Sequence, residues 1–170
     1  MNYGNIKECD IADGPGVRVS LFVSGCRHHC KGCFNAETWD FNFGQPYTED
    51  TEKEIIDALA PSYIEGFSLL GGEPFEPENQ PVLAELLQKI KATYPVKNVW
   101  CYSGYLFDSD LQPGGSVYTE FTDQMLEMIR THHREIPKKE ALKQCIEMLS
   151  RVGIPSPEQR IKEFPHQMSG

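Results

Sequence analysis

Three cysteines, Cys26, Cys30 and Cys33, follow one another in a short stretch with the spacing Cys-x3-Cys-x2-Cys. The stretch comes directly after residues 17–23, which are rich in β-branched and apolar side chains and are expected to form a strand. Thiolates are soft ligands, and three of them on a tight loop can converge on one iron–sulfur cube. A [4Fe–4S] cube held by only three protein ligands keeps one iron open. The spacing therefore predicts an iron–sulfur site at which a small chelating molecule can bind and react.

Two other uses of these cysteines are open from the residues alone. A structural zinc site would take His28 or His29 as its fourth ligand, but such sites usually present two separated ligand pairs. A redox-active Cys30-x-x-Cys33 pair would leave Cys26 without a role. The iron–sulfur interpretation uses all three thiols. It leaves His28 and His29 as solvent-facing loop residues.

The composition is that of a soluble globular protein and limits the possible partners. The chain has 170 residues and a net charge of −9, which argues against sequence-independent binding to nucleic acid. No apolar run approaches the length that spans a bilayer, and the first residues lack a signal-peptide pattern, so no membrane partner and a cytoplasmic location are expected. In a reducing compartment the clustered cysteines indicate metal binding. Three further thiols, expected to be buried or half-buried, are Cys9, Cys101 and Cys145.

Strand-like and helix-like segments alternate along the chain. Strands are expected at residues 17–23, 66–70 and 96–102, and helices at residues 51–59, 81–92 and 122–129. Thr51 and Thr122 are the expected helix caps, and Pro81 is expected at a first helical position. This alternation predicts an α/β fold with a parallel sheet and helices outside it.

Each expected strand ends at a loop that could contribute to a site. These loops are the cysteine stretch, Gly71-Gly72-Glu73-Pro74, and Ser103-Gly104. In parallel α/β folds, binding sites gather at the carboxyl ends of the strands, so the three loops are expected to share one edge. The segment Asp13-Gly14-Pro15-Gly16-Val17-Arg18 is expected to be a turn that enters the first strand, with Arg18 facing solvent or an acidic neighbour.

Taken together, these motifs resemble those of a known family. The cysteine loop followed by Gly71-Gly72-Glu73-Pro74 resembles the radical S-adenosylmethionine superfamily. Asp13-Gly14-Pro15-Gly16-x-Arg18 is similar to the glycyl-radical-enzyme activating enzymes within it. The stretches Cys30 to Trp39 and Val99 to Tyr105 resemble the branch that activates anaerobic ribonucleoside-triphosphate reductase. The likeness extends from about Asn2 to Ile129.

The resemblance implies a fold, two cofactors and a set of site residues. The fold would be a partial, open (β/α) barrel of the radical S-adenosylmethionine type. A [4Fe–4S] cluster would be held by Cys26, Cys30 and Cys33, and its open iron would chelate S-adenosylmethionine. Reductive cleavage of that cofactor would yield a 5′-deoxyadenosyl radical, which takes a hydrogen atom from a glycine of the reductase. The residues implied in binding S-adenosylmethionine are Phe34, Gly71, Gly72, Glu73 and Ser103, with Tyr105 as a further candidate.

The resemblance also implies the partners. The protein would be an oxidoreductase in which no side chain acts as a catalytic acid or base. It would act on the large, glycyl-radical subunit of anaerobic ribonucleotide reductase and would receive electrons from a low-potential donor such as flavodoxin. Two alternatives stay open, namely activation of a different glycyl radical enzyme and a non-enzymatic iron–sulfur electron carrier.

The last part of the chain departs from the family pattern. The radical S-adenosylmethionine core is expected at residues 1–129, and an atypical helical C-terminal tail at residues 130–170, packed on or extending from the same domain. Where the family continues into a short apolar strand, this chain has Arg130-Thr131-His132-His133-Arg134-Glu135. Pro137 then begins an expected amphipathic helix. Natural divergence and an altered reading frame would both produce such a tail.

Overall fold

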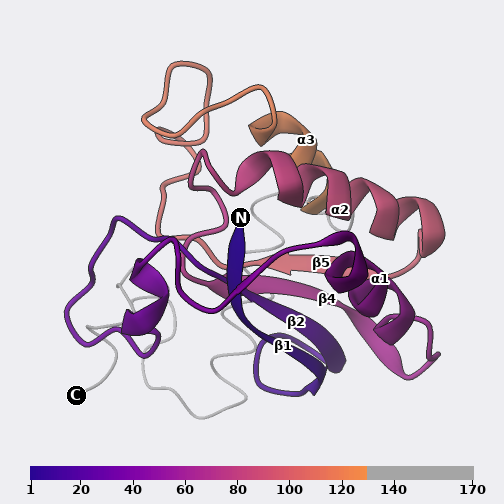
Figure 1. The fold of residues 1–170 in the computed structure, drawn as a ribbon. Coiled ribbons are helices and arrows are strands. Elements are labelled where there is room, and N and C mark those ends of the chain that lie inside the picture. Colours follow the sequence, from indigo (N-terminus) through magenta and orange to yellow (C-terminus); the bar gives the residue numbers. More distant parts are fainter. Residues whose placement is uncertain (130–170) are drawn as a thin grey trace, which may run out of the picture. The chain divides into compact units, whose positions relative to one another are not determined.

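The computed structural model of the protein describes residues 1–129, which form one mixed α/β domain around a twisted sheet (Figure 1). The expected tail helix, its apolar face and Cys145 lie outside the described residues. The strands are β1 (Asn2–Asp10), β2 (Val17–Val23), β3 (Gln45–Pro46), β4 (Ile64–Gly71) and β5 (Asn98–Cys101). The helices are the 3-10 helix η1 (Ala36–Trp39) and the α-helices α1 (Glu49–Ala58), α2 (Gln80–Thr93) and α3 (Thr122–Ile129).

The sheet has five strands in the order β3-β1-β2-β4-β5. The three strands expected from the sequence, β2, β4 and β5, are parallel, with Leu21 opposite Leu69 and Leu69 opposite Cys101. β1 and β3 were not expected, and both pair in the antiparallel sense. The sheet is therefore mixed and open, not purely parallel. β1 carries mostly exposed or half-buried side chains, and this explains why its sequence lacks the apolar run of a buried strand.

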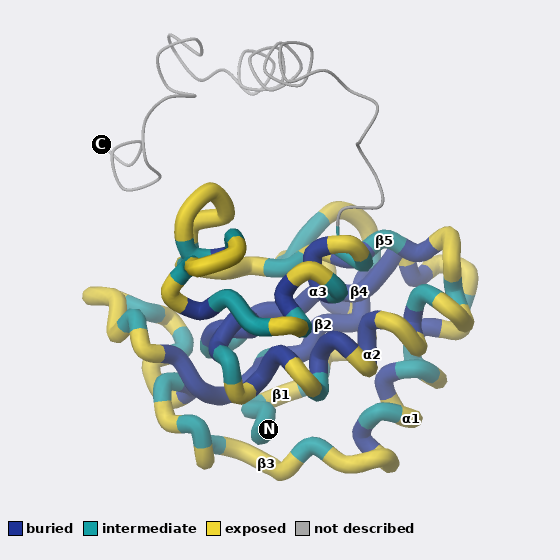
Figure 2. Tube along the Cα trace, turned by 90° about the horizontal axis from the view of Figure 1, so that it is seen from above, coloured by how far each residue is buried: buried dark blue, intermediate teal, exposed yellow. Residues whose placement is uncertain are grey.

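The three α-helices pack on the same face of the sheet (Figure 1). Val19, Leu21 and Val23 of β2 alternate toward this face and are fully buried, as strand periodicity requires. Figure 2 shows β2 and β4 as the most continuously buried strands at the centre of the domain. Their helical partners are completely buried as well, namely Ile55, Leu59, Leu83, Leu86, Leu87, Ile90 and Met125.

The helix ends differ slightly from the expectation, for identifiable reasons. α1 begins after Thr48, because the Thr48 and Thr51 side chains each bond the other's backbone N–H in a capping box. Thr51 is thus the third helical residue and not the cap. Pro81 lies in the first turn of α2, as expected. Thr122 is the first residue of α3, and its hydroxyl accepts a hydrogen bond from Thr119 N–H at 2.8 Å.

Arg18 does not face solvent, because its side chain is completely buried; the acidic neighbour is Glu65, which acts on its charge, but the hydrogen bonds go to neutral acceptors. The guanidinium donates from Nε to Ser68 Oγ at 2.7 Å, from Nη1 to Pro15 O at 3.1 Å and from Nη2 to Phe67 O at 2.8 Å. Burial lowers the pKa of Arg18 from its ordinary value. Arg18 therefore fixes the turn after β1 to the central strand β4, a role that uses all three nitrogens of the guanidinium and cannot be read from a local pattern.

Candidate functional site

Backbone hydrogen bonds join the loops that follow β2 and β4. Gly72 N–H donates to Val23 O at 2.7 Å, and Glu73 N–H donates to Gly25 O at 2.8 Å. After β5, Tyr102 N–H continues the ladder by donating to Leu69 O at 2.9 Å. The expectation that three loops meet at one edge is therefore confirmed, and it follows from the parallel register of the strands.

Two glycines at the end of β4, Gly71 and Gly72, are required by backbone conformation and by close packing against the chain around the cysteine loop. Gly71 has a φ of 101°, a left-handed conformation that favours glycine. A Cβ atom on Gly72 would lie 2.6 Å from Gly25 O and 3.0 Å from Thr38 O. Gly25 immediately precedes the first cysteine. The close approach that the sequence suggested at Gly72 is thus, in the described structure, an approach to backbone.

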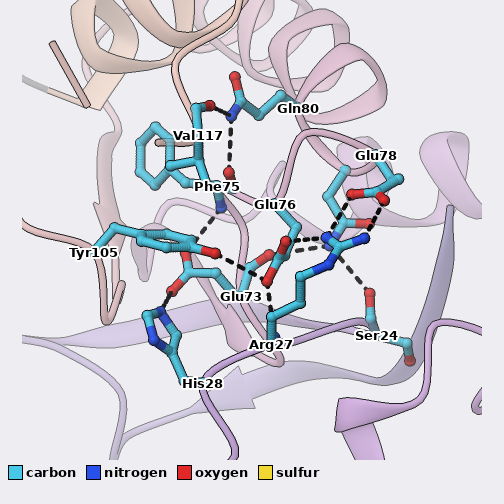
Figure 3. Close-up of polar contacts among 11 residues, drawn as sticks. Ser24, Arg27, His28, Glu73, Phe75, Glu76, Glu78, Gln80, Tyr105 and Val117 are labelled. Atoms are coloured by element: carbon cyan, nitrogen blue, oxygen red, sulfur yellow. Dashed lines mark hydrogen bonds and ion pairs between the residues drawn. The ribbon is translucent and has the colours of Figure 1, made fainter. Parts of the chain in front are cut away.

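Glu73 joins the loop after β4 to the loop after β5. Its side chain is buried, and one carboxylate oxygen accepts from Phe75 N–H and Ser103 Oγ, each at 2.9 Å. The other oxygen accepts from Gly104 N–H at 2.7 Å. Burial raises the pKa of Glu73 above its ordinary value, although these hydrogen bonds act in the opposite direction. The carboxylate is thus held by donors from the loops after β4 and β5. Figure 3 shows the hydrogen bond from Phe75.

A second buried carboxylate, that of Glu76, binds the beginning of the cysteine loop. Arg27 donates its backbone N–H to Glu76 Oε1 at 2.8 Å, and its guanidinium contacts Glu76 Oε2 and the exposed carboxylate of Glu78 (Figure 3). The hydroxyl of Tyr105 also donates to Glu76 Oε1, at 3.1 Å. Burial and the neighbouring Glu76 carboxylate raise the pKa of Tyr105. Glu76 therefore binds groups from two different loops.

His28 is turned inward, so the expectation that it faces solvent is wrong. Its Nε2 lies 3.4 Å from Glu73 Oε2, and its ring lies on Tyr105 with ring centroids 4.4 Å apart. The Nε2 atom is buried but makes no hydrogen bond of good geometry. His29 is exposed, as expected, and meets the edge of Trp39 instead. The two adjacent histidines therefore have different surroundings.

The three loop cysteines differ in exposure. Cys26 is buried, Cys33 is half-buried and Cys30 is exposed. Burial raises the pKa of the Cys26 thiol. Cys33 N–H donates to Cys30 O at 3.1 Å, so these two residues share a tight turn, and Gly32 inside it has a φ of 78°. Cys101 is half-buried as expected, whereas the expectation for Cys9 is wrong because Cys9 is exposed.

The cysteines offer the donor set of an iron–sulfur cluster. Within residues 1–129, no three side chains of His, Cys, Asp or Glu stand close enough to form a ready metal site. Cys26 is anchored by its backbone N–H, which donates to Trp39 O of η1 at 3.2 Å, and nothing lies within 4 Å of the Cβ position of Gly32. Three soft thiols on one loop, two of them on an open turn, fit an iron–sulfur cluster by ligand type.

The structure brings together most of the residues that the sequence singled out. Gly71, Gly72, Glu73 and Ser103 lie at the junction of the loops, next to the anchored half of the cysteine loop. Phe34 is fully exposed, so its expected contact with an adenine stays a prediction. Sequence reasoning missed Arg27, Glu76 and the inward position of His28. The spacing Glu73-x-x-Glu76 after the glycine pair was the sequence signal that could have indicated Glu76. Asn79, three residues further on, donates to Ser24 O and Glu73 O, both at 3.0 Å, and so also joins the two loops.

Comparison with known proteins agrees with this site. Residues 12–140 match the family model described as "4Fe-4S single cluster domain". The fold and the site thus define an iron–sulfur protein of the α/β class. Over 108 residues the chain is 45% identical to the anaerobic ribonucleoside-triphosphate reductase-activating protein of Enterobacteria phage T4, covering 64% of this chain and 69% of that protein.

Bacterial proteins of the same name match equally well. The identity is 46% over 110 residues for the protein of Escherichia coli (strain K12), covering 64% of this chain and 71% of the relative. It is 43% over 107 residues for that of Vibrio cholerae, covering 62% and 69%. The chain belongs to the family of anaerobic ribonucleoside-triphosphate reductase-activating proteins. The resemblance inferred from the motifs is confirmed.

Proposed function

We propose that this protein activates an anaerobic ribonucleoside-triphosphate reductase by generating a glycyl radical in its large subunit. The observation that carries the proposal is membership of the family of activating proteins, which the identity of 45–46% to relatives of that name establishes. The connected cysteine and Glu73 loops supply the structural support, because they join a metal-binding segment to a second loop at one edge of the sheet.

The metal site would be built by the three loop cysteines. Cys26, Cys30 and Cys33 would hold a [4Fe–4S] cluster, which when bound supplies the electron for reductive cleavage of S-adenosylmethionine. Arg27 and its Glu76 partner hold the chain beside Cys26 in place, which lowers the ordering cost of binding a cluster.

The S-adenosylmethionine site would lie beside the metal site. Glu73 and Ser103 hold the loops after β4 and β5 together, so groups on both can orient one ligand. Gly72 lies against the Gly25 carbonyl and hence near the first cysteine, and Gly71 lies against the backbone of Phe22 and Val23 at the end of β2. Phe34, exposed and next to Cys33, offers an aromatic face for an adenine. The binding residues of the proposal are Phe34, Gly71, Gly72, Glu73 and Ser103.

The fold type and domain organisation follow the same proposal. Three parallel strands with helices on one face are compatible with part of a (β/α) barrel, in which β1 and β3 extend one edge. We assign the core to residues 1–129 and an atypical tail to residues 130–170. A family-typical ending grafted after Ile129 should raise the yield of glycyl radical if that tail weakens partner binding.

The remaining partners are inferred from chemistry. The protein would receive electrons from a low-potential one-electron donor such as flavodoxin, and a net charge of −9 disfavours nucleic acid as a partner. Among residues 1–129 no helix is both long and apolar enough to cross a membrane. We propose a cytoplasmic location, where thiols stay reduced.

Anaerobic reconstitution with iron and sulfide tests the function. With a low-potential one-electron reductant such as reduced flavodoxin present, we expect formation of 5′-deoxyadenosine from S-adenosylmethionine and a glycyl-radical EPR signal when the reductase is added. Changing any one loop cysteine to Ala should abolish both signals and the bound iron, whereas Cys9→Ala and Cys101→Ala should keep the iron. A cluster whose EPR spectrum ignores S-adenosylmethionine would instead indicate an electron carrier. Cleavage without a glycyl radical in this reductase would indicate a different target enzyme.

A further inference from the structure

The contact between His28 and Glu73 has no role in the function described so far. His28 lies between Cys26 and Cys30 in the cysteine loop, and Glu73 belongs to the loop after β4 (Figure 3). The side chain of His28 reaches Glu73, the carboxylate that binds Ser103 and Gly104 and so holds the β4 and β5 loops together. Movement of its imidazole would therefore affect the loops after β4 and β5 together.

Three neighbours enclose the imidazole. Glu73 Oε2 lies 3.4 Å from His28 Nε2, and the Tyr105 ring covers one side of it. The third neighbour is Gly104, where an added Cβ would lie only 2.7 Å from His28 Nε2. Gly104 has an ordinary backbone conformation, so within the described structure its small size is explained by the presence of His28 and not by strain. The side chain of His28 is only 25% exposed.

The same carboxylate oxygen also accepts the hydrogen bond from Gly104 N–H. An oxygen that already has one strong partner can take a second only if the donor approaches at a suitable angle, and His28 Nε2 is close but not aligned. A small movement of the cysteine loop would bring Nε2 into hydrogen-bonding alignment with Glu73 Oε2 or carry it further away. The contact is therefore sensitive to the position of the loop.

We propose that His28 is a positioning residue that couples the cysteine loop to the S-adenosylmethionine loops through Glu73. The inference rests on the proposed function. When the loop is drawn into its metal-binding position, His28 holds Glu73 and thereby Ser103 and Gly104 in the arrangement that receives S-adenosylmethionine. By thermodynamic reciprocity, binding of that cofactor then affects the cysteine loop to the same extent.

Three variants separate the parts of this contact. His28→Phe keeps a ring on Tyr105 but removes the donor toward Glu73, and His28→Gln keeps an N–H donor but removes the ring. His29→Asn is the matched control, because His29 has a φ of 47°, which Asn tolerates, and its ring meets Trp39 away from this contact. In each reconstituted protein we would measure bound iron, the dissociation constant of S-adenosylmethionine and the change it causes in the cluster EPR spectrum.

We expect wild-type iron content in all three variants. His28→Phe should bind S-adenosylmethionine about tenfold more weakly and lose most of the EPR change, a factor that corresponds to about 1.4 kcal/mol. His28→Gln should recover part of both, and His29→Asn should match the wild type. Wild-type affinity and EPR change in His28→Phe would overturn the proposal. Loss of iron in His28→Phe would overturn it as well, because His28 would then act in assembling the metal site.

A measurement on the metal-free protein does not depend on the cofactor. Removing the anchor in His28→Ala should raise the rate of Cys26 alkylation by iodoacetamide about tenfold, with little change at the already exposed Cys30. Peptide mass spectrometry reads both sites in one sample, and His29→Asn again provides the control. An unchanged Cys26 rate would refute the anchoring role of His28. If the wild-type protein fails to cleave S-adenosylmethionine while this rate rises, the proposed function fails and the coupling contact stands.

Discussion

Replacing Arg18 by Met tests whether a buried guanidinium holds the β1–β2 turn to the central sheet. Methionine fills a similar length of apolar space but donates no hydrogen bond. Pro15 O, Phe67 O and Ser68 Oγ would all lose their charged donor. The expected effect is therefore a large loss of stability with no direct effect on the cysteine loop, which follows the opposite end of β2.

The magnitude follows from opposing contributions. A hydrogen bond to a charged group contributes about 1.5–3 kcal/mol, so three of them contribute roughly 4.5–9 kcal/mol. Removing the buried charge relieves a desolvation cost of several kcal/mol. We expect a net loss of about 3 kcal/mol in the free energy of unfolding, out of a total of about 5–15 kcal/mol for a typical domain.

Urea unfolding of the metal-free protein under reducing conditions measures this loss, with tryptophan fluorescence as the signal. Lys53→Met is the matched control, because Lys53 is exposed on α1 and its replacement should change stability by at most about 0.5 kcal/mol. If Arg18→Met changes stability no more than Lys53→Met does, Arg18 faces solvent after all and the argument is refuted. Iron bound per folded molecule should match the wild type, which separates stability from site assembly.

Two further changes test the site. Gly72→Val places a side chain against Gly25 O and Thr38 O, so both bound iron and affinity for S-adenosylmethionine should fall in reconstituted protein. If either stays at the wild-type value, close packing at Gly72 is not what the site requires. Glu78→Gln removes a carboxylate whose pKa the Arg27 hydrogen bond lowers below 4.5. Since a lowered carboxylate pKa stabilises the fold above that value, the variant should be less stable by up to about 1 kcal/mol at pH 7. The difference should vanish as the pH falls through the folded pKa in a urea series; a constant difference would contradict the ion-pair assignment.

The sequence by itself determined the parts of this protein that depend on local pattern. Residues 17–23 formed β2 as expected, since the apolar residue types at Val19, Leu21 and Val23 predict the alternating burial that the structure has. The spacing of the cysteines indicated the kind of ligand, and parallel strands placed the loops at one edge. These features depend only on residue chemistry and periodicity, so the sequence alone is enough to indicate the family.

The sequence did not determine contacts between distant segments. β1 was missed because a strand with mostly exposed or half-buried side chains carries no buried pattern, and Arg18 was misplaced because its partners Phe67 and Ser68 lie about fifty residues away. Tertiary structure alone turned His28 inward while its neighbour His29 stayed exposed. The physical reason is the same in each case: the strands, side chains and rings that decide these positions come from distant parts of the chain, which a local sequence pattern does not record.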